Sequence, residues 1–339
     1  MAMNESLALG MLEATELTRA GRLQEATAAI QRALGQRPVS KPKPREREKT
    51  IELPEGRAGE FSAGSYTHPH GTRPYKLYVP TSFAAGKALP LVVMLHGCTQ
   101  NPDDFAAGTR MNLLAEEKHC FVLYPAQTRS ANRTQCWNWF KHAHQRRDKG
   151  EPAIIAGMTR EVVKRYGIDA RKVYVAGLSA GGAMAAVMGA AYPDVYAAVG
   201  IHSGLPVGSA HDLPSAFAAM SGAPPASPSG AAAGRIVPAI VFHGDRDTTV
   251  HPRNGEHVAS QCVERHDESL DVVVQRGQAP GGYAYTCSVH KDAAGRIVLE
   301  HWEVHGAGHA WFGGSASGSY TDPKGPDAAR EMLRFFCST

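Results

Sequence analysis

The stretch Gly177-Leu-Ser-Ala-Gly181 holds the residue of this 339-residue chain that is best suited to covalent chemistry. An apolar, β-branched run precedes it from Val173, and a run rich in Ala and Met follows it. The order is therefore a strand, a sharp turn and a helix, with small residues where a strained turn leaves no room for bulk. This context predicts that Ser179 projects from the tip of a strand as a nucleophile, and a plain glycine-rich turn is the alternative.

A serine hydroxyl needs a base within hydrogen-bond reach and a carboxylate that orients the base. For the carboxylate, Asp247 is preferred to Asp245, which is expected to cap its own loop. For the base, His309 is preferred to His305, because the glycines before His309 let its loop fold over the serine. The resulting order along the chain, Ser179 then Asp247 then His309, is the order of the α/β-hydrolases.

The tetrahedral intermediate of acyl transfer needs two N–H donors that are already in place. The amide of Ala180, at the start of the helix after the serine, is one expected donor. The other is expected after the buried strand Leu89–Leu95, where the Cys98 amide is preferred and the Thr99 amide is second. Thr99 is also a candidate contact for substrate.

Three of the four tryptophans lie in segments expected near the serine, namely Trp137, Trp139 and Trp311. Ligand clefts are usually lined by apolar and aromatic side chains. We therefore expect at least one of them to line the substrate cleft, and the alternative is that they fill the bases of loops. His96 and His243, each before a glycine, are expected to bond to backbone instead.

Strand and helix signals alternate from about residue 59 onward, which indicates a mostly parallel sheet with helices on both faces. With the Ser, Asp, His order, this pattern predicts an α/β-hydrolase fold over residues 59–339. Residues 1–35 are predicted to form a helical hairpin, and residues 36–58 a basic, proline-rich linker. The hairpin has too little surface to stand alone, so it packs on its own domain or serves as a docking or homodimer arm.

Charge and hydropathy exclude two kinds of partner. Residues 37–49 hold six Lys/Arg and two Glu, which accounts for the whole net charge of +4, so we expect no nucleic acid partner. No apolar run approaches the roughly 20 residues of a membrane span, and the N-terminus lacks the features of a secretory signal. The sequence predicts a cytoplasmic protein, or a secreted one if a leader has been removed.

Six cysteines are spread along the chain without the spacing of a metal site and without a C-x-x-C motif, so they indicate neither a zinc site nor a redox site. Pairing of Cys98 with Cys136, or of Cys262 with Cys287, stays open.

Four runs of residues resemble, in combination, the polyhydroxybutyrate depolymerase family esterases, which are related to feruloyl and acetylxylan esterases. The runs are Leu95-His-Gly-Cys-Thr-Gln100, Cys136-Trp-Asn-Trp-Phe140, Gly177-Leu-Ser-Ala-Gly-Gly-Ala-Met184 and His305-Gly-Ala-Gly-His-Ala-Trp311 through Gly318-Ser-Tyr-Thr-Asp322. The resemblance covers about residues 60–337. It implies hydrolysis of hydroxyalkanoate oligomers or short-chain esters by Ser179, Asp247 and His309, without metal or organic cofactor. A feruloyl or acetylxylan esterase, or an idle hydrolase fold that only binds, are the alternatives.

Overall fold

The computed structural model describes residues 59–84, 86–224, 237–266 and 269–338. The hairpin expected over residues 1–35 and the linker expected over residues 36–58 lie outside the described residues.

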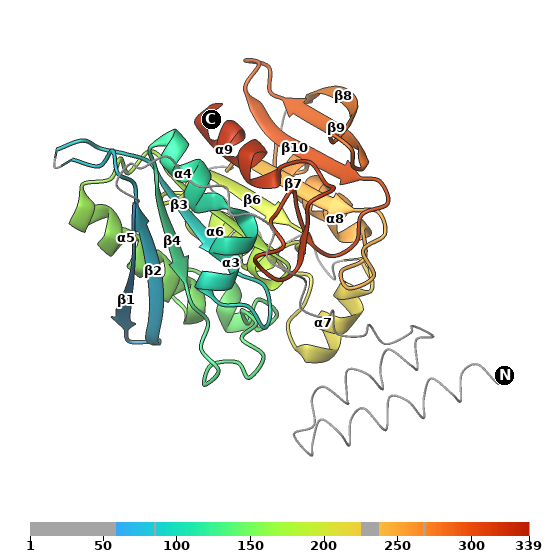
Figure 1. Cartoon of the computed structure of the whole chain (residues 1–339). Helices are drawn as coiled ribbons and strands as arrows, with labels where there is room; N and C mark the ends of the chain where they lie inside the picture. The colour runs from blue at the N-terminus through green and yellow to red at the C-terminus, as the bar shows by residue number, and fades with distance from the viewer. Residues whose placement is uncertain (1–58, 85, 225–236, 267–268, 339) are drawn as a thin grey trace, which may run out of the picture. The chain divides into compact units, whose positions relative to one another are not determined.

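A ten-stranded sheet runs through the described chain in the order β1-β2-β4-β3-β5-β6-β7-β10-β9-β8 (Figure 1). Its strands are β1 (Glu60–His68), β2 (Gly71–Val79), β3 (Leu91–Leu95), β4 (Phe121–Pro125), β5 (Val173–Leu178), β6 (Ala198–His202), β7 (Ala239–Gly244), β8 (Asp271–Gln278), β9 (Ala284–Lys291) and β10 (Ile297–Val304). Neighbours from β4 to β10 are parallel, and antiparallel strands border them at both ends of the sheet.

The strands β3 to β7 are buried along their whole length, which explains why they are continuous apolar runs in the sequence. One core packs between the sheet and the helices α5 (Gly150–Tyr166), α6 (Ala180–Ala191) and α8 (Arg253–Val263). A second core packs under α3 (Pro102–Thr109), α4 (Met111–Lys118) and α9 (Ala328–Ser338) on the other face. The α/β-hydrolase expectation of a mostly parallel sheet covered on both faces is confirmed.

Four smaller elements complete the described chain. A short 3-10 helix (His142–Gln145) follows β4, the helix α7 (Leu213–Met220) follows β6, and the short parallel strands β11 (Trp311–Phe312) and β12 (Thr321–Asp322) follow β10. None of the helices in the described part of the chain combines the length and the apolarity needed to cross a membrane.

The turn between β5 and α6 depends on two glycines that lie against neighbouring backbone. A Cβ atom on Gly181 would lie 2.0 Å from the carbonyl oxygen of Leu95 and 2.6 Å from that of His96. A Cβ atom on Gly177 would lie 2.4 Å from Gly181. Since the obstacles are backbone atoms, no side chain can rotate away to make room, and the end of β3 is held directly against the start of α6.

Replacing Gly181 with alanine should therefore force the end of β3 away from α6. We expect Gly181→Ala to lower the free energy of unfolding by about 3 kcal/mol or more, measured by urea denaturation. The control is Gly308→Ala, because a Cβ atom on Gly308 has nothing within 4 Å, and its change should stay within about 0.5 kcal/mol. Equal losses in the two variants would contradict this account of the turn.

Candidate active site

The segments that carry the predicted site residues all follow parallel strands, at the edge where those strands end. Cys98 follows β3, Ser179 follows β5, Asp247 follows β7 and His309 follows β10. Ligands of open α/β sheets bind beyond the carboxyl ends of the strands. The topology therefore brings the four segments to one edge of the sheet.

Ser179 lies at the tip of the strand-to-helix turn, with φ 58° and ψ −120°. A positive φ is uncommon for a residue other than glycine, and such strain gathers at functional sites. Its neighbours Leu178 and Ala180 are buried, whereas Ser179 itself is partly exposed. Its amide donates to the carbonyl of His202 (2.9 Å). The backbone is thus fixed while the hydroxyl group faces accessible space.

His309 and Asp247 form a short hydrogen bond, with 2.6 Å between His309 Nδ1 and Asp247 Oδ2. The Asp247 side chain is fully buried, and its Oδ1 atom accepts from the amides of Thr249 (2.9 Å) and Val250 (2.8 Å). Burial alone would raise the pKa of Asp247, but the hydrogen bonds from His243 and His309 outweigh it and lower the pKa. The ionised carboxylate makes Nδ1 of His309 the donor, which leaves Nε2 free to accept a proton.

His202 joins the serine turn to the segment after His309, a role that the sequence did not predict. Its carbonyl accepts from the Ser179 amide, and its Nε2 atom accepts from the Phe312 amide (3.1 Å). The Trp311 ring stacks on the His202 ring, with 5.0 Å between their centroids. Burial lowers the pKa of His202 well below its ordinary value, so the ring stays neutral and its Nε2 atom can accept.

No hydrogen bond joins the Ser179 hydroxyl to His309 in the described structure. Catalytic hydrogen bonds are often long before substrate binds and shorten only in the complex. The structure thus pairs Asp247 with His309, and His202 joins the Ser179 turn to the segment after His309. The role of Ser179, Asp247 and His309 as a triad stays a prediction.

Asp245 and His305 form a separate pair. Asp245 accepts from the amide of Gly306 (2.6 Å) and from Nδ1 of His305 (3.2 Å), and Nε2 of His305 bonds to Thr286 (2.9 Å). Asp245 was expected to cap its own loop. That expectation is wrong, because the carboxylate instead ties the segment after β7 to the segment after β10.

The two amides expected to bind an oxyanion differ in their partners. Ala180 is the first residue of α6, and the first amides of a helix have no partner within the helix. The Thr99 amide is engaged, because it donates to the carbonyl of Thr134 (2.7 Å). No partner of the Cys98 amide is found among the described residues, so the geometry favours Cys98 over Thr99. A Cβ atom on Gly97 would lie 3.7 Å from Cβ of Ser179, which places this segment beside the serine.

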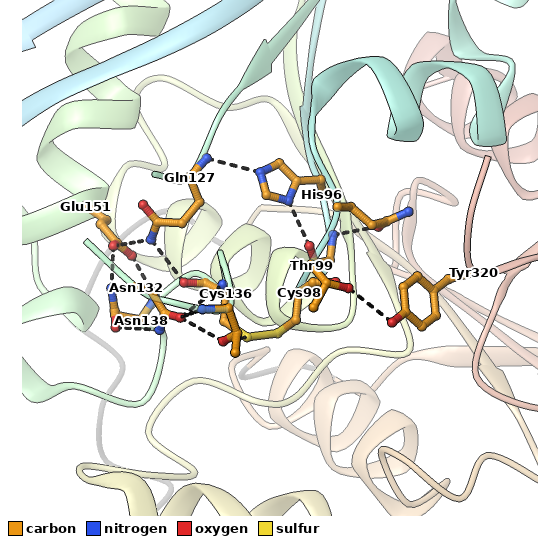
Figure 2. The surroundings of a disulfide bond; sticks show 12 residues. His96, Cys98, Thr99, Gln127, Asn132, Cys136, Asn138, Glu151 and Tyr320 are labelled. Atoms are coloured by element: carbon orange, nitrogen blue, oxygen red, sulfur yellow. Dashed lines mark hydrogen bonds between the residues drawn. A yellow bond between two sulfur atoms is a disulfide. The ribbon is translucent and has the colours of Figure 1, made fainter. Parts of the chain in front are cut away.

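The segment around Cys98 is held from both sides (Figure 2). Cys98 forms a disulfide with Cys136, whereas Cys262 and Cys287 are free, which answers the question of pairing. On the other side the Thr99 hydroxyl bonds to the hydroxyl of Tyr320 (3.1 Å). Tyr320, which was not predicted as a site residue, is 48% exposed, so it is accessible to a substrate.

Gln100 and the histidines at the strand ends support this edge through the backbone. Gln100 accepts from the Gly97 amide (2.9 Å) and donates to Asp104 (2.9 Å). His96 bonds to the carbonyl of Gly97 (2.8 Å), and His243 bonds to the carbonyl of Val250 (2.8 Å). The backbone role expected for the two histidines is confirmed.

The tryptophans proposed for the cleft are core residues in this structure. Trp137, Trp139 and Trp311 expose 0%, 6% and 1% of their surface. Trp137 packs near the His96 ring, with 5.6 Å between the centroids. Contact of any of these tryptophans with substrate stays a prediction, and their burial favours the alternative that they fill the bases of loops.

One group of side chains in the described residues could hold a metal ion. Ligand atoms of Asp245, Glu303 and His305 lie within 4.8 Å of one another. The hydrogen bond between Asp245 and His305, and the bonds of this pair to Thr286 and Gly306, account for two of these three side chains without an ion.

This chain is similar to a known protein family in sequence and to a solved structure in fold. The model of the family described as "Esterase PHB depolymerase" matches residues 73–279, which is more than half of the chain. An acetyl xylan esterase from Aspergillus awamori has a similar fold, with a TM-score of 0.64 and 22% sequence identity over 82% of this chain and 100% of that one.

Three curated relatives are similar in sequence. Poly(3-hydroxyalkanoate) depolymerase C of Paucimonas lemoignei is 34% identical over 72% of this chain, and poly(3-hydroxybutyrate) depolymerase of Ralstonia pickettii is 30% identical over 66%. The chain covers only 59% and 48% of the lengths of these depolymerases. Feruloyl esterase B of Neurospora crassa is 29% identical over 80% of this chain and 89% of its own length. The match of the family model over more than half of the chain shows that this chain belongs to the PHB depolymerase family of esterases.

Proposed function

We propose that the chain is a serine carboxylesterase that hydrolyses carboxylic esters through an acyl-enzyme. The observation that carries the proposal is the 2.6 Å hydrogen bond from His309 to the buried Asp247 carboxylate, at the sheet edge where the Ser179 turn also lies. Family membership supports it, since the relatives are named as esterases and depolymerases.

The proposed reaction has two halves. Ser179 Oγ attacks the ester carbonyl carbon while Nε2 of His309 takes the hydroxyl proton, and Asp247 stabilises the imidazolium that forms. The Ala180 and Cys98 amides bind the oxyanion of the tetrahedral intermediate. His309 then donates the proton to the leaving alcohol. Water attacks the acyl-enzyme by the same route in reverse and regenerates Ser179.

The substrate class that we propose is a hydroxyalkanoate oligomer or another short-chain ester. Two of the relatives are named for polyhydroxyalkanoates. A feruloyl or acetylxylan esterase is the second candidate, because the chain covers far more of the length of feruloyl esterase B than of either depolymerase. Rates on hydroxybutyrate oligomers, methyl ferulate and acetylated sugars separate the two candidates.

The compartment and the subunit count belong to the proposal as well. The cytoplasmic location expected from the sequence stays a prediction, and the Cys98–Cys136 disulfide favours an oxidising compartment instead. Thiol titration of the protein taken from its native compartment tests this point. The homodimer expected through residues 1–35 also stays a prediction, and sizing the chain with and without residues 1–50 tests it.

Removing the nucleophile tests the esterase against an idle fold that only binds. Ser179→Ala should lower kcat on p-nitrophenyl acetate and butyrate by about 10⁴-fold or more, because no other group can form the acyl-enzyme. Ser260→Ala is the control, since Ser260 is an exposed serine on α8, and its kcat should equal that of the wild type. If Ser179→Ala still hydrolyses these esters at the wild-type rate, the proposal is wrong.

The lowered pKa of Asp247 predicts how stability depends on pH. The folded state favours the ionised carboxylate, so its contribution is complete above the unfolded pKa of about 3.9 and is lost as the pH falls through the lower folded value. The difference in unfolding free energy between wild type and Asp247→Asn should therefore be largest near neutral pH and shrink below about pH 4. Urea unfolding at a series of pH values measures it, and a constant difference would contradict the prediction.

A further inference from the structure

Glu151, in the first turn of α5, is a buried carboxylate that the proposed reaction does not use. Its side chain is 1% exposed. One oxygen accepts from the side-chain amides of Gln127 (2.5 Å) and Asn138 (2.6 Å), and the other accepts from the Asn138 backbone amide (2.7 Å). Nδ1 of His144 lies at 3.4 Å. Nη2 of Arg73 lies 3.5 Å from the first of these oxygens. Five nitrogen atoms thus surround this buried carboxylate.

Glu151 is ionised at neutral pH. Burial alone would raise its pKa, but the contacts with His144, Gln127 and the Asn138 amide outweigh it and lower the pKa below its ordinary value. Hydrogen bonds to a charged group are stronger than neutral ones, so this carboxylate holds in place the segment that contains Gln127 and Asn138.

The anchored segment leads directly to the disulfide, as Figure 2 shows. Cys136 is two residues before Asn138, and its carbonyl accepts from the same Gln127 amide group that donates to Glu151 (3.0 Å). Asn132 adds a second support, because its side chain donates to Asn138 (3.1 Å) and accepts from the Thr134 amide (3.0 Å). Cys136 is therefore fixed by the network that surrounds Glu151.

Two links connect the segment around Cys136 to the segment that carries the Cys98 amide. The disulfide joins Cys136 to Cys98, and the Thr99 amide donates to Thr134 (2.7 Å). The Cys98 amide directly precedes these two links in the chain, in the segment that passes beside Ser179. The path from the carboxylate to the amide is thus continuous.

We propose that Glu151 is a positioning residue for oxyanion binding, acting through Asn138, Cys136 and the disulfide to hold the Cys98 amide in place. This inference rests on the proposed function. Oxyanion donors stabilise the transition state only if they already lie about 2.7–3.1 Å from the developing charge. Glu151 itself touches no reacting atom, so its effect appears in the transition state and not in substrate binding.

Glu151→Gln tests the inference, because it puts an NH2 group against donors that need an acceptor. We expect kcat on p-nitrophenyl butyrate to fall roughly tenfold, with KM within about twofold of the wild type. Affinity for an alkyl boronic acid, which forms a tetrahedral adduct on the serine, should fall by a similar factor. A role in folding alone would leave kcat and boronate affinity unchanged in the folded protein.

Glu300→Gln is the matched control. Glu300 is also a buried carboxylate (2% exposed), but its partners are Trp302 on β10 and Arg334 on α9. Both variants should lose stability, and only Glu151→Gln should lose kcat, with each assayed well below its Tm. If Ser179→Ala is inactive while Glu151→Gln keeps the kcat of Glu300→Gln, the inference about Glu151 is wrong and the proposed function stands. If Ser179→Ala stays active, the proposed function itself fails.

A second variant tests the same path without touching Glu151. The double variant Cys98→Ser, Cys136→Ser keeps the backbone amides of residues 98 and 136 but removes the disulfide between them. Its kcat should fall by a factor similar to that of Glu151→Gln. Adding Glu151→Gln to this pair should cost little more, because the two changes interrupt one path. If the two losses in kcat multiply fully in the combined variant, the inference is wrong. It is also wrong if the variant with both cysteines replaced by serine keeps the wild-type kcat.

Discussion

The close approach of two backbones beneath Ser179 is the constraint on which the site depends. The peptide at Gly181 lies so near the carbonyl groups of Leu95 and His96 that a single Cβ atom would not fit. This contact holds the end of β3 against the start of α6, and it therefore brings the Cys98 and Ala180 segments to the same serine. The positive φ of Ser179 is maintained by this packing, and not by any preference of serine for that conformation.

Around this turn, buried titratable side chains are held in defined protonation states. His96 and His202 are kept neutral, because burial lowers the pKa of His96 to about 4 and that of His202 well below its ordinary value. Asp247 and Glu151 stay ionised although burial opposes it, because several N–H donors converge on each carboxylate. His202 and Asp247 each connect segments that follow different strands, so the electrostatics of the site and the placement of its loops depend on one another.

Much of the fold could be predicted because the central strands are buried on both faces and therefore appear as unbroken apolar runs. The elements that were not predicted lack such a signal. β8 is exposed along nearly its whole length, so Val272, Val273 and Val274 show no alternation. The buried face of α8 includes Asn254 and Gly255 as well as apolar residues, so the sequence shows no clear helical repeat of apolar residues there. α3 was also not predicted, although the sequence holds a helix-start signal there, because Asn101 caps the helix and Pro102 follows.

By itself the sequence determined the strand, turn and helix around Ser179, the order Ser179, Asp247, His309, and the family, because these are properties of local pattern and of order along the chain. Only the tertiary structure decided that Asp247 and not Asp245 bonds to His309, that the Thr99 amide is engaged, and that Cys98 pairs with Cys136. The roles of His202 and Glu151 also appeared only there. These features depend on contacts between segments far apart in the chain, and such contacts leave no periodicity in the sequence.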